Sequence, residues 1–297
     1  ALPICHYDAF CVFDADNLVH LDFLAVMNTR LMKGQKVLQG YLSAKNPVDT
    51  WVSGTFAIAF WTVNHLWHLG KYNLGLSSCL GGTGMCISAD IVREFGWGCD
   101  CLTEDMEFSM KCLSHGIRTC WVHDAIIYDE KPLTFMASWR QRKRWAQGQF
   151  DCSERYIPIL MKEGFKRHSI VVLDGIMQLL QNYFLLISAF YLVMTYINMF
   201  YPCFTVVLYN DALVPRQFWS VLGTIQYVLP LIVLLQIEVP AKIYLYWLIY
   251  PVFMYSWVPV TFLGWIHRHE KQWVHTIHTR SMQFQAASLT RKKEIDS

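Results

Sequence analysis

The pattern of apolar and polar positions predicts a layered fold for the first half of the chain. Short apolar runs there alternate with segments of helical periodicity, and charged residues occur at an ordinary globular density. A buried strand is predicted over residues 7–12, a second strand over residues 85–88, and a turn with a short strand over residues 34–40. Helices are predicted over residues 21–32 and 50–69. Because strands and helices alternate, we expect an α/β layer fold.

The second half of the chain is strongly apolar and carries few charges. Three of its stretches are long enough to cross a bilayer, and prolines, tyrosines and tryptophans lie at or near their ends. These stretches are residues 176–201, 218–236 and 243–266. We therefore predict transmembrane helices within residues 176–266.

The predicted spans divide the rest of the chain. Residues 151–175 are expected to form an interfacial connection, and residues 267–297 a basic polar tail. Three spans would place the first half and the tail on opposite sides of the bilayer, whereas basic residues favour the cytoplasmic side for both. One stretch could be re-entrant, or a further span could be hidden in the first stretch, so the number of spans stays open.

Composition adds a few constraints. The formal net charge of +2 is too small to indicate nucleic acid binding, and the basic residues cluster near the predicted membrane boundary, so lipid is the expected anionic partner. The ten cysteines form no CxxC pair and are expected to be reduced thiols. The chain opens with Ala1, close to a predicted strand, and we expect a fragment or a processed chain.

Two aspartates follow the first predicted strand. Asp14 and Asp16 are alternate residues, so in an extended strand their carboxylates face one spot. At the carboxyl end of a strand, such a pair can bind a divalent cation that bridges diphosphate oxygens. An acidic turn between strand and helix explains the same residues, and both interpretations stay open at this point.

A second acidic group opens a predicted helix. Thr103 suits the N-cap, and Glu104 and Asp105 complement the positive end of the helix dipole. Gly116 can end this helix. Side chains at a helix start point out of the fold, where backbone N–H groups can keep a carboxylate ionised, as a general base requires. Plain helix capping is the alternative explanation.

A basic and aromatic helix follows. Gln141, Arg144 and Trp145 are spaced i, i+3, i+4 and therefore share one face. An amide, a guanidinium and an indole on one face can bind an oxygen-rich anion and stack on a sugar ring. The cations of this segment, flanked by two tryptophans, also suit a basic helix lying on anionic lipid headgroups. These residues are Trp139, Arg140, Arg142, Lys143, Arg144 and Trp145.

Two smaller features of the first half supply further candidate residues. Gly82, Thr83 and Gly84 belong to a Gly-Gly-Thr-Gly turn before a predicted strand. Glycines let the backbone approach a ligand closely, although a tight turn needs nothing more. His65 and His68 are spaced i, i+3 on a predicted helix, and without a third ligand we expect ordinary helix-face histidines.

Taken in order, these motifs resemble the family 2 inverting glycosyltransferases. The resemblance is carried by Asp-x-Asp after a strand, the Gly-Gly-Thr-Gly turn, the Thr-Glu-Asp helix start and Gln-x-x-Arg-Trp, with membrane spans after them. Hyaluronan, chitin and cellulose synthases and the bacterial poly-N-acetylglucosamine synthases belong to that group. The resemblance implies that residues 1–150 form the C-terminal part of a catalytic domain with a glycosyltransferase-A-like α/β fold. The nucleotide-binding strands before Asp14 would be missing, so we expect this polypeptide alone to bind donor poorly.

The resemblance also implies roles for individual residues. Asp14 and Asp16 would hold Mg²⁺ or Mn²⁺ against the diphosphate of a nucleotide sugar. Asp105, in an acid pair with Glu104, would take the proton of the acceptor hydroxyl, and a single displacement would invert the anomeric centre. The other motif residues would bind substrate, with Cys79 and Leu80 shaping the acceptor pocket. These residues are Gly82, Thr83, Gly84, Gln141, Arg144 and Trp145.

Three hypotheses follow from these expectations. The first is an integral membrane, metal-dependent glycosyltransferase of the cytoplasmic face that moves a sugar from a UDP-linked donor to a growing β-linked polysaccharide. The second is transfer of a single sugar to a lipid acceptor, such as a lipid phosphate or ceramide. The third is a non-catalytic membrane scaffold in which the acidic residues only cap helices.

Overall fold

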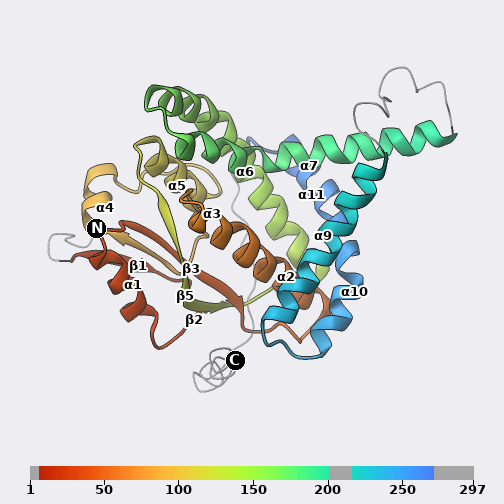
Figure 1. Cartoon of the computed structure of the whole chain (residues 1–297), viewed down its shortest axis with the longest axis horizontal. Coiled ribbons are helices and arrows are strands. Elements are labelled where there is room, and N and C mark those ends of the chain that lie inside the picture. Colours follow the sequence, from red (N-terminus) through yellow and green to blue (C-terminus); the bar gives the residue numbers. More distant parts are fainter. Residues whose placement is uncertain (1–6, 201–215, 271–297) are drawn as a thin grey trace.

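A five-stranded mixed sheet supports the first half of the chain (Figure 1). The computed structural model describes residues 7–200 and 216–270. The strands are β1 (Ala9–Val12), β2 (Leu18–Val19), β3 (Val37–Ala44), β4 (Met85–Ser88) and β5 (Thr119–Asp129). Their order in the sheet is β1-β4-β3-β5-β2. Only β3 and β5 run parallel, and the other neighbours are antiparallel.

Helices cover the sheet and make up the second half of the chain. In the first half they are α1 (Phe23–Met32), α2 (Trp51–Thr62), the π-helix η2 (Val63–His68), α3 (Leu69–Asn73), α4 (Ala89–Phe95) and α5 (Glu104–Ser114). The remaining helices are α6 (Phe135–Lys166), α7 (Ile170–Phe200), α9 (Arg216–Gln236), α10 (Lys242–Tyr255) and α11 (Trp257–Ile266). The predicted helices over residues 21–32 and 50–69 correspond to α1 and to α2 with η2, so the first half is an α/β domain as expected.

Two strands differ from the prediction. The first was expected to be buried, but β1 is an edge strand of intermediate exposure because it pairs only with β4 among the described strands. The short strand expected up to Gly40 continues to Ala44 as β3, and all eight of its residues are buried. Because successive side chains of a strand point to opposite faces, β3 is covered on both faces of the sheet and does not show the alternation of a half-exposed strand.

The parallel pair β3 and β5 brings two chain segments to one end of the sheet. Gly40 pairs with Val122 and Tyr41 with Ile126, so residues 123–125 of β5 bulge out of the ladder. A Cβ atom on Gly40 would lie 2.5 Å from the carbonyl oxygen of Ala125, so only glycine fits beside the bulge. Beyond the bulge the ladder resumes, and both strands end side by side at Ala44 and Asp129.

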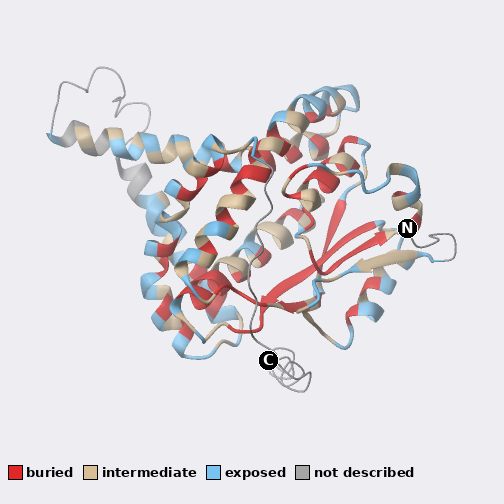
Figure 2. Cartoon of the chain, turned by 180° about the vertical axis from the view of Figure 1, so that it is seen from behind, coloured by how far each residue is buried: buried red, intermediate tan, exposed pale blue. Residues whose placement is uncertain are grey.

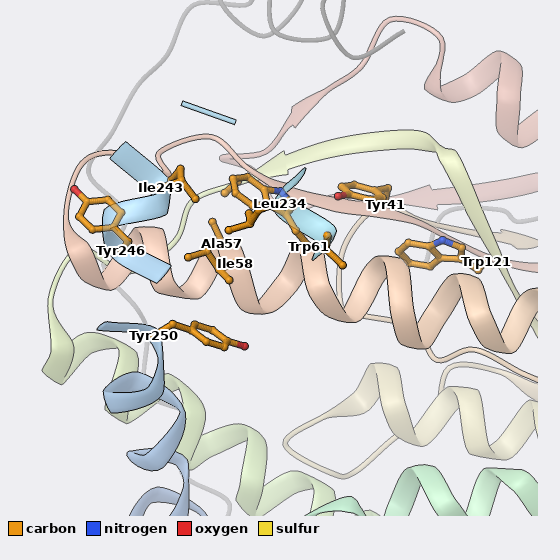
Figure 3. Packing of buried hydrophobic residues seen from close by; sticks show 11 residues of the cluster. Tyr41, Ala57, Ile58, Trp61, Trp121, Leu234, Ile243, Tyr246 and Tyr250 are labelled. Atoms are coloured by element: carbon orange, nitrogen blue, oxygen red, sulfur yellow. The ribbon is translucent and has the colours of Figure 1, made fainter. Parts of the chain in front are cut away.

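Helix α2 lies between the sheet and the C-terminal helices (Figure 3). A capping box starts it, because the Thr50 hydroxyl accepts a hydrogen bond from the Ser53 N–H and Ser53 reciprocates. Most of its residues are buried, as expected for a helix that is apolar on all sides. Trp61 belongs to one hydrophobic cluster together with Tyr41 of β3 and Tyr246 of α10.

The three predicted apolar stretches are helical in the residues that the structure describes. Two helical segments, Ile170–Met194 and Lys242–Ile266, are long and apolar enough to cross a membrane by length and composition, and Val221–Gln236 is a shorter apolar helix. The last stretch consists of α10 and α11, and Ser256 between them keeps a helical backbone conformation. Most of the predicted basic tail lies outside the described residues.

The two halves of helix α7 differ in how far their side chains are exposed. In its first half, Asp174 forms an ion pair of 2.7 Å with Lys71 of α3, and Gln178 accepts a hydrogen bond from the Trp67 indole. Beyond residue 183, large apolar side chains such as Ile187 and Phe190 are more than half exposed, and this part projects away from the sheet (Figures 1 and 2). The first half of α7 is therefore docked on the α/β domain.

Helix α6 joins the two halves of the molecule. It continues without interruption across residue 150, so the connection expected over residues 151–175 consists of its second half, a short turn and the start of α7. A Cβ atom on Gly264 of α11 would lie 2.5 Å from the Cβ atom of Ala146, which shows how closely α11 approaches α6. The segment carrying Gln141, Arg144 and Trp145 is thus held between the sheet domain and the apolar helices.

Candidate active site

The hydroxyl group of Thr83 joins two of the predicted motifs. It accepts hydrogen bonds from the Asp14 backbone N–H, at 3.0 Å, and from the Asn17 amide. The two motifs meet because β1, which ends before Asp14, pairs with β4, which begins after Gly84. Thr83 is buried, so its hydroxyl fixes the turn that carries the aspartates.

Gln39 holds the glycine-rich turn from the opposite side. Its side-chain amide donates to the Thr83 carbonyl oxygen at 2.9 Å, and its side-chain oxygen accepts from the Gly81 N–H at 2.8 Å. Gln39 is 1% exposed, in the middle of buried β3. Gly82 and Gly84 have φ angles of +80° and +62°, a backbone conformation that glycine adopts readily.

Asp14 and Asp16 do not extend the strand as expected. The Asn17 N–H donates to the Asp14 carbonyl oxygen, so residues 14–17 form a turn. Asp14 acts electrostatically on Arg144, whereas the Asp16 carboxylate lies 3.7 Å from the Lys45 ammonium. The expectation that residues 14–16 continue the extended strand is therefore wrong, since the backbone bends between the two aspartates.

Asp105 lies against the glycine-rich turn. A Cβ atom on Gly82 would be 3.4 Å from one Asp105 carboxylate oxygen, and the other oxygen accepts from the Met106 N–H at 2.7 Å. The Ser109 hydroxyl donates to the Asp105 carbonyl oxygen and accepts from the Leu80 N–H. These bonds tie the first turn of α5 to the turn that also contacts Asp14.

The electrostatics of Asp105 differ from the expectation. Burial, reinforced by the charge of Glu104, raises the pKa of Asp105 to about 7 and outweighs the backbone N–H groups and Arg144, which lower it. The helix start was expected to keep the carboxylate ionised, but burial outweighs the backbone N–H groups, while the residue as a whole keeps an intermediate exposure. A carboxyl group with a pKa near 7 suits a general base at neutral pH.

Thr103 occupies the N-cap position but does not cap the helix. Its side chain makes no cap hydrogen bond, and its hydroxyl packs against Gly148 of α6. The loop before α5 is held by Glu107, whose carboxylate accepts from the N–H groups of Asp100 and Cys101 at 2.7 and 2.8 Å. Gly116, with a φ angle of +85°, follows the end of the helix as predicted.

Arg144 interacts electrostatically with three acidic residues of the site. Burial lowers its pKa, while Glu104, Asp105 and Asp14 raise it, so the guanidinium lies within the electrostatic influence of all three carboxylates. One of its terminal nitrogens donates to the Leu102 carbonyl oxygen at 3.3 Å. Its buried Nε atom and the buried side-chain oxygen of Gln141 have no hydrogen-bond partner within the described part of the chain.

Trp145 faces helix α2. Its ring centroid lies 5.8 Å from that of Phe56 and 6.3 Å from that of Phe60. The Lys131 ammonium lies over the Phe60 ring, 3.5 Å from its centroid. Trp145 therefore belongs to an aromatic contact between α6 and α2, on the face of α6 that also carries Arg144.

Arg142 contradicts the interpretation of this segment as a basic surface helix. Its side chain is fully buried, lies 4.4 Å from the Phe253 ring centroid and donates to the Ser256 hydroxyl at 2.8 Å. Burial lowers its pKa to about 10. The cations of α6 therefore do not share an exposed face, because α10 and α11 cover the side on which Arg142 lies.

The structure also shows the surroundings of the remaining predicted residues. Cys79 and Leu80 are buried in hydrophobic clusters. His68 stacks on Trp121, and His65 contacts His123, so both histidines take part in an aromatic cluster. The described cysteines are free thiols.

Asp14 and Asp16, the predicted metal ligands, suit an ion that also takes ligands from water and substrate better than an ion bound by protein side chains alone. Within residues 7–200 and 216–270, no group of three or more His, Cys, Asp or Glu side chains could hold a metal ion by itself. Mg²⁺ commonly binds through one or two carboxylates and takes its other ligands from water and substrate phosphates. Asp14 and Asp16 are a suitable donor set of that kind.

Sequence reasoning missed the residues that position this site. Gln39 is a buried polar residue inside β3, Lys45 and Glu130 are buried polar residues that directly follow strand ends, and Ser109 is one turn into α5. A polar residue in an otherwise apolar strand was the available signal for Gln39, since a buried amide needs hydrogen-bond partners.

Replacing Thr83 by valine is expected to loosen the turn of residues 14–17. Valine keeps the shape but removes the acceptor for the Asp14 N–H and the Asn17 amide, which should lower the free energy of unfolding by about 1–3 kcal/mol. Thermal unfolding of the purified protein measures this loss. Thr83→Ser is the control, because it keeps the hydroxyl, and equal losses in both variants would contradict the assigned role.

Comparison with known proteins adds a separate line of information. Residues 9–265 match the family model described as "Glycosyl transferase family group 2". The chain is also similar to a protein of Bacillus subtilis (strain 168) described as "Probable glycosyltransferase YdaM", with 26% identity over 144 residues. These residues are 48% of this chain and 34% of that protein, so the chain spans about a third of the length of the curated relative it matches.

Proposed function

Because the chain belongs to glycosyl transferase family group 2, we propose that it moves a sugar from a UDP-linked nucleotide sugar to a growing β-linked polysaccharide. The reaction takes place at the cytoplasmic face of a membrane, and the apolar helices anchor the protein there. The membership of the family supports transfer from a nucleotide sugar to an acceptor. The more specific parts of the proposal rest on the arrangement of the side chains.

One observation carries the proposal. Arg144 lies within the influence of Asp14, Glu104 and Asp105, which come from two distant parts of the sequence. The glycine-rich turn contacts Asp105 through Gly82 and the Asp14 turn through Thr83. Acidic residues and a guanidinium thus meet around one backbone turn, as the transfer of a sugar from a diphosphate requires.

The chemistry assigned to the residues follows from their charges. Asp105 takes the proton of the acceptor hydroxyl as its oxygen attacks the anomeric carbon, and its pKa of about 7 matches that task at neutral pH. The bond to the diphosphate breaks as the bond to the acceptor forms, so a single displacement inverts the anomeric centre. The Arg144 Nε atom and the Gln141 side-chain oxygen lack partners within the described chain, so Arg144 donates to an oxygen atom of the substrates and Gln141 accepts from a sugar hydroxyl.

A divalent cation completes the proposal. Asp14 and Asp16 would hold Mg²⁺ or Mn²⁺, which neutralises charge on the departing diphosphate when it is bound. The protein supplies the two carboxylates and keeps their turn in place through Thr83 and Lys45.

A transfer assay tests the proposed function. Membranes containing the complete protein are incubated with Mn²⁺ and a panel of radiolabelled nucleotide sugars, and the product is separated by size. We expect a polymer to form from a UDP-linked sugar. Its formation should stop when the metal is removed by a chelator. A product of one sugar on lipid would favour transfer to a lipid acceptor, and no transfer from any donor would favour the non-catalytic scaffold.

A further inference from the structure

A buried ion pair lies where β3 and β5 end side by side. Lys45 follows the last residue of β3, Glu130 follows the last residue of β5, and the Lys45 ammonium lies 3.0 Å from the Glu130 carboxylate. The side chains of both residues are only 3% and 4% exposed. Such a pair is costly to form and is strongly destabilised by removal of one partner alone.

The same ammonium group reaches the turn that carries the aspartates. Lys45 Nζ donates a hydrogen bond of 2.8 Å to the backbone carbonyl oxygen of Asp16, and it lies 3.7 Å from the Asp16 carboxylate. One cation therefore contacts both the backbone and the side chain of Asp16. It approaches from the protein interior, so it leaves the exposed side of the carboxylate accessible.

The sheet holds Lys45 rigidly. Its backbone N–H donates to the Asp129 carbonyl oxygen at 3.0 Å. The next residue, Asn46, exchanges two hydrogen bonds of 2.8 Å with the backbone of Lys131. The two strand ends are thus locked together, and the position of the Lys45 side chain is set by the parallel pair of strands.

We infer that Lys45, with Glu130 as its counter-ion, is a positioning residue that sets the orientation of Asp16 for metal and diphosphate binding. The inference rests on the proposed function, in which Asp16 holds the metal. Lys45 does not touch substrate, because its side chain is almost completely buried. It fixes the Asp16 carbonyl oxygen, and thereby the backbone from which the carboxylate projects.

A double variant separates positioning from folding and from charge. Lys45→Met/Glu130→Gln removes one positive and one negative charge, so the local net charge stays the same and no buried charge is left alone. Lys71→Met/Asp174→Asn is the matched control, because Lys71 is also a buried lysine with a close carboxylate partner but contacts α7. Mn²⁺ binding in the presence of UDP is measured by electron paramagnetic resonance on the complete protein, and folding by thermal unfolding.

We expect the Lys45/Glu130 double variant to fold and to bind Mn²⁺ about 10–100-fold more weakly, since loss of a group that orients a metal ligand has effects of that size. The control should bind as the unchanged protein does. If the double variant fails to fold, Lys45→Arg replaces it, because arginine keeps a charge opposite Glu130 and changes the contact with Asp16. Unchanged Mn²⁺ affinity in a folded variant overturns the positioning role of Lys45 but not the metal role of Asp16. Absence of Mn²⁺ binding by the unchanged protein overturns both roles.

Discussion

Replacing Asp105 by asparagine is expected to slow sugar transfer by about two to four orders of magnitude, the usual contribution of a general base. Asparagine keeps the size of the side chain and can still accept a hydrogen bond from the Met106 N–H, so the fold should persist. Turnover with the donor identified in the panel assay measures the loss. A scaffold protein would be indifferent to the change in every readout except stability.

The pH dependence gives this prediction a second readout. The pKa of Asp105 is raised from about 3.9 in the unfolded chain to about 7 in the folded protein, so the base is protonated and transfer falls as the pH drops below 7. Between these two values the folded state binds the proton and the unfolded state does not, so stability declines as the pH rises. The asparagine variant should therefore gain thermal stability relative to the unchanged protein as the pH rises from 4 to 8.

Asp100→Asn is a suitable control for these measurements. Asp100 lies in the loop before α5, and its backbone N–H, which the substitution keeps, makes the hydrogen bond to Glu107. We expect its transfer rate and its pH profile to match those of the unchanged protein. Full activity of the Asp105 variant, or an acidic limb near pH 4 in the unchanged protein, would contradict the assignment of Asp105 as the base.

Replacing Arg144 by glutamine is expected to reduce transfer by about 10²–10³-fold, the size of effect seen when a preorganised electrostatic donor is removed. The guanidinium also lowers the pKa of Asp105, so its loss should move the acidic limb of the pH profile to higher pH. Both effects come from the charge of Arg144. A shift of the acidic limb would show that this charge acts on Asp105, whereas a residue that only packs between helices would leave the limb in place. Initial rates between pH 5 and 9 measure both.

Arg140→Gln tests whether the effect depends on position. Arg140 is an exposed cation one turn earlier on the same helix, so the net charge changes equally but the site does not. Its rate and pH profile should stay unchanged. A fall in rate for Arg144→Gln without any shift of the acidic limb would show that Arg144 does not act on Asp105.

The grouping of motifs could be predicted because strand pairing brings them together. The turn after β1 and the turn before β4 must meet if these strands are antiparallel neighbours. Asp105 lies at the start of α5, which packs against β4. The helix over residues 50–69 was also predictable from its cap and its continuous apolar run. These features depend on local pattern and on strands that are close in the sheet.

Other features depend on partners that are far away in the sequence. Arg142 is buried because its partner Ser256 lies 114 residues later, and no local pattern distinguishes it from Arg140. Asp16 turns toward Lys45 because the backbone bends at residues 14–17, which an alternating pattern cannot show. The raised pKa of Asp105 likewise arises from surrounding protein, whereas its position at a helix start favoured the opposite shift.

The burial of α2 on both sides has a consequence for biosynthesis. A Cβ atom on Gly54 would lie 2.1 Å from the Tyr246 ring, so this helix is shaped to receive a segment that the ribosome makes much later. Until that segment emerges, residues such as Ile58 and Trp61 have no cover on one side, and a nascent chain in this state is prone to aggregate. The core around α2 is therefore completed only after α10 has been translated.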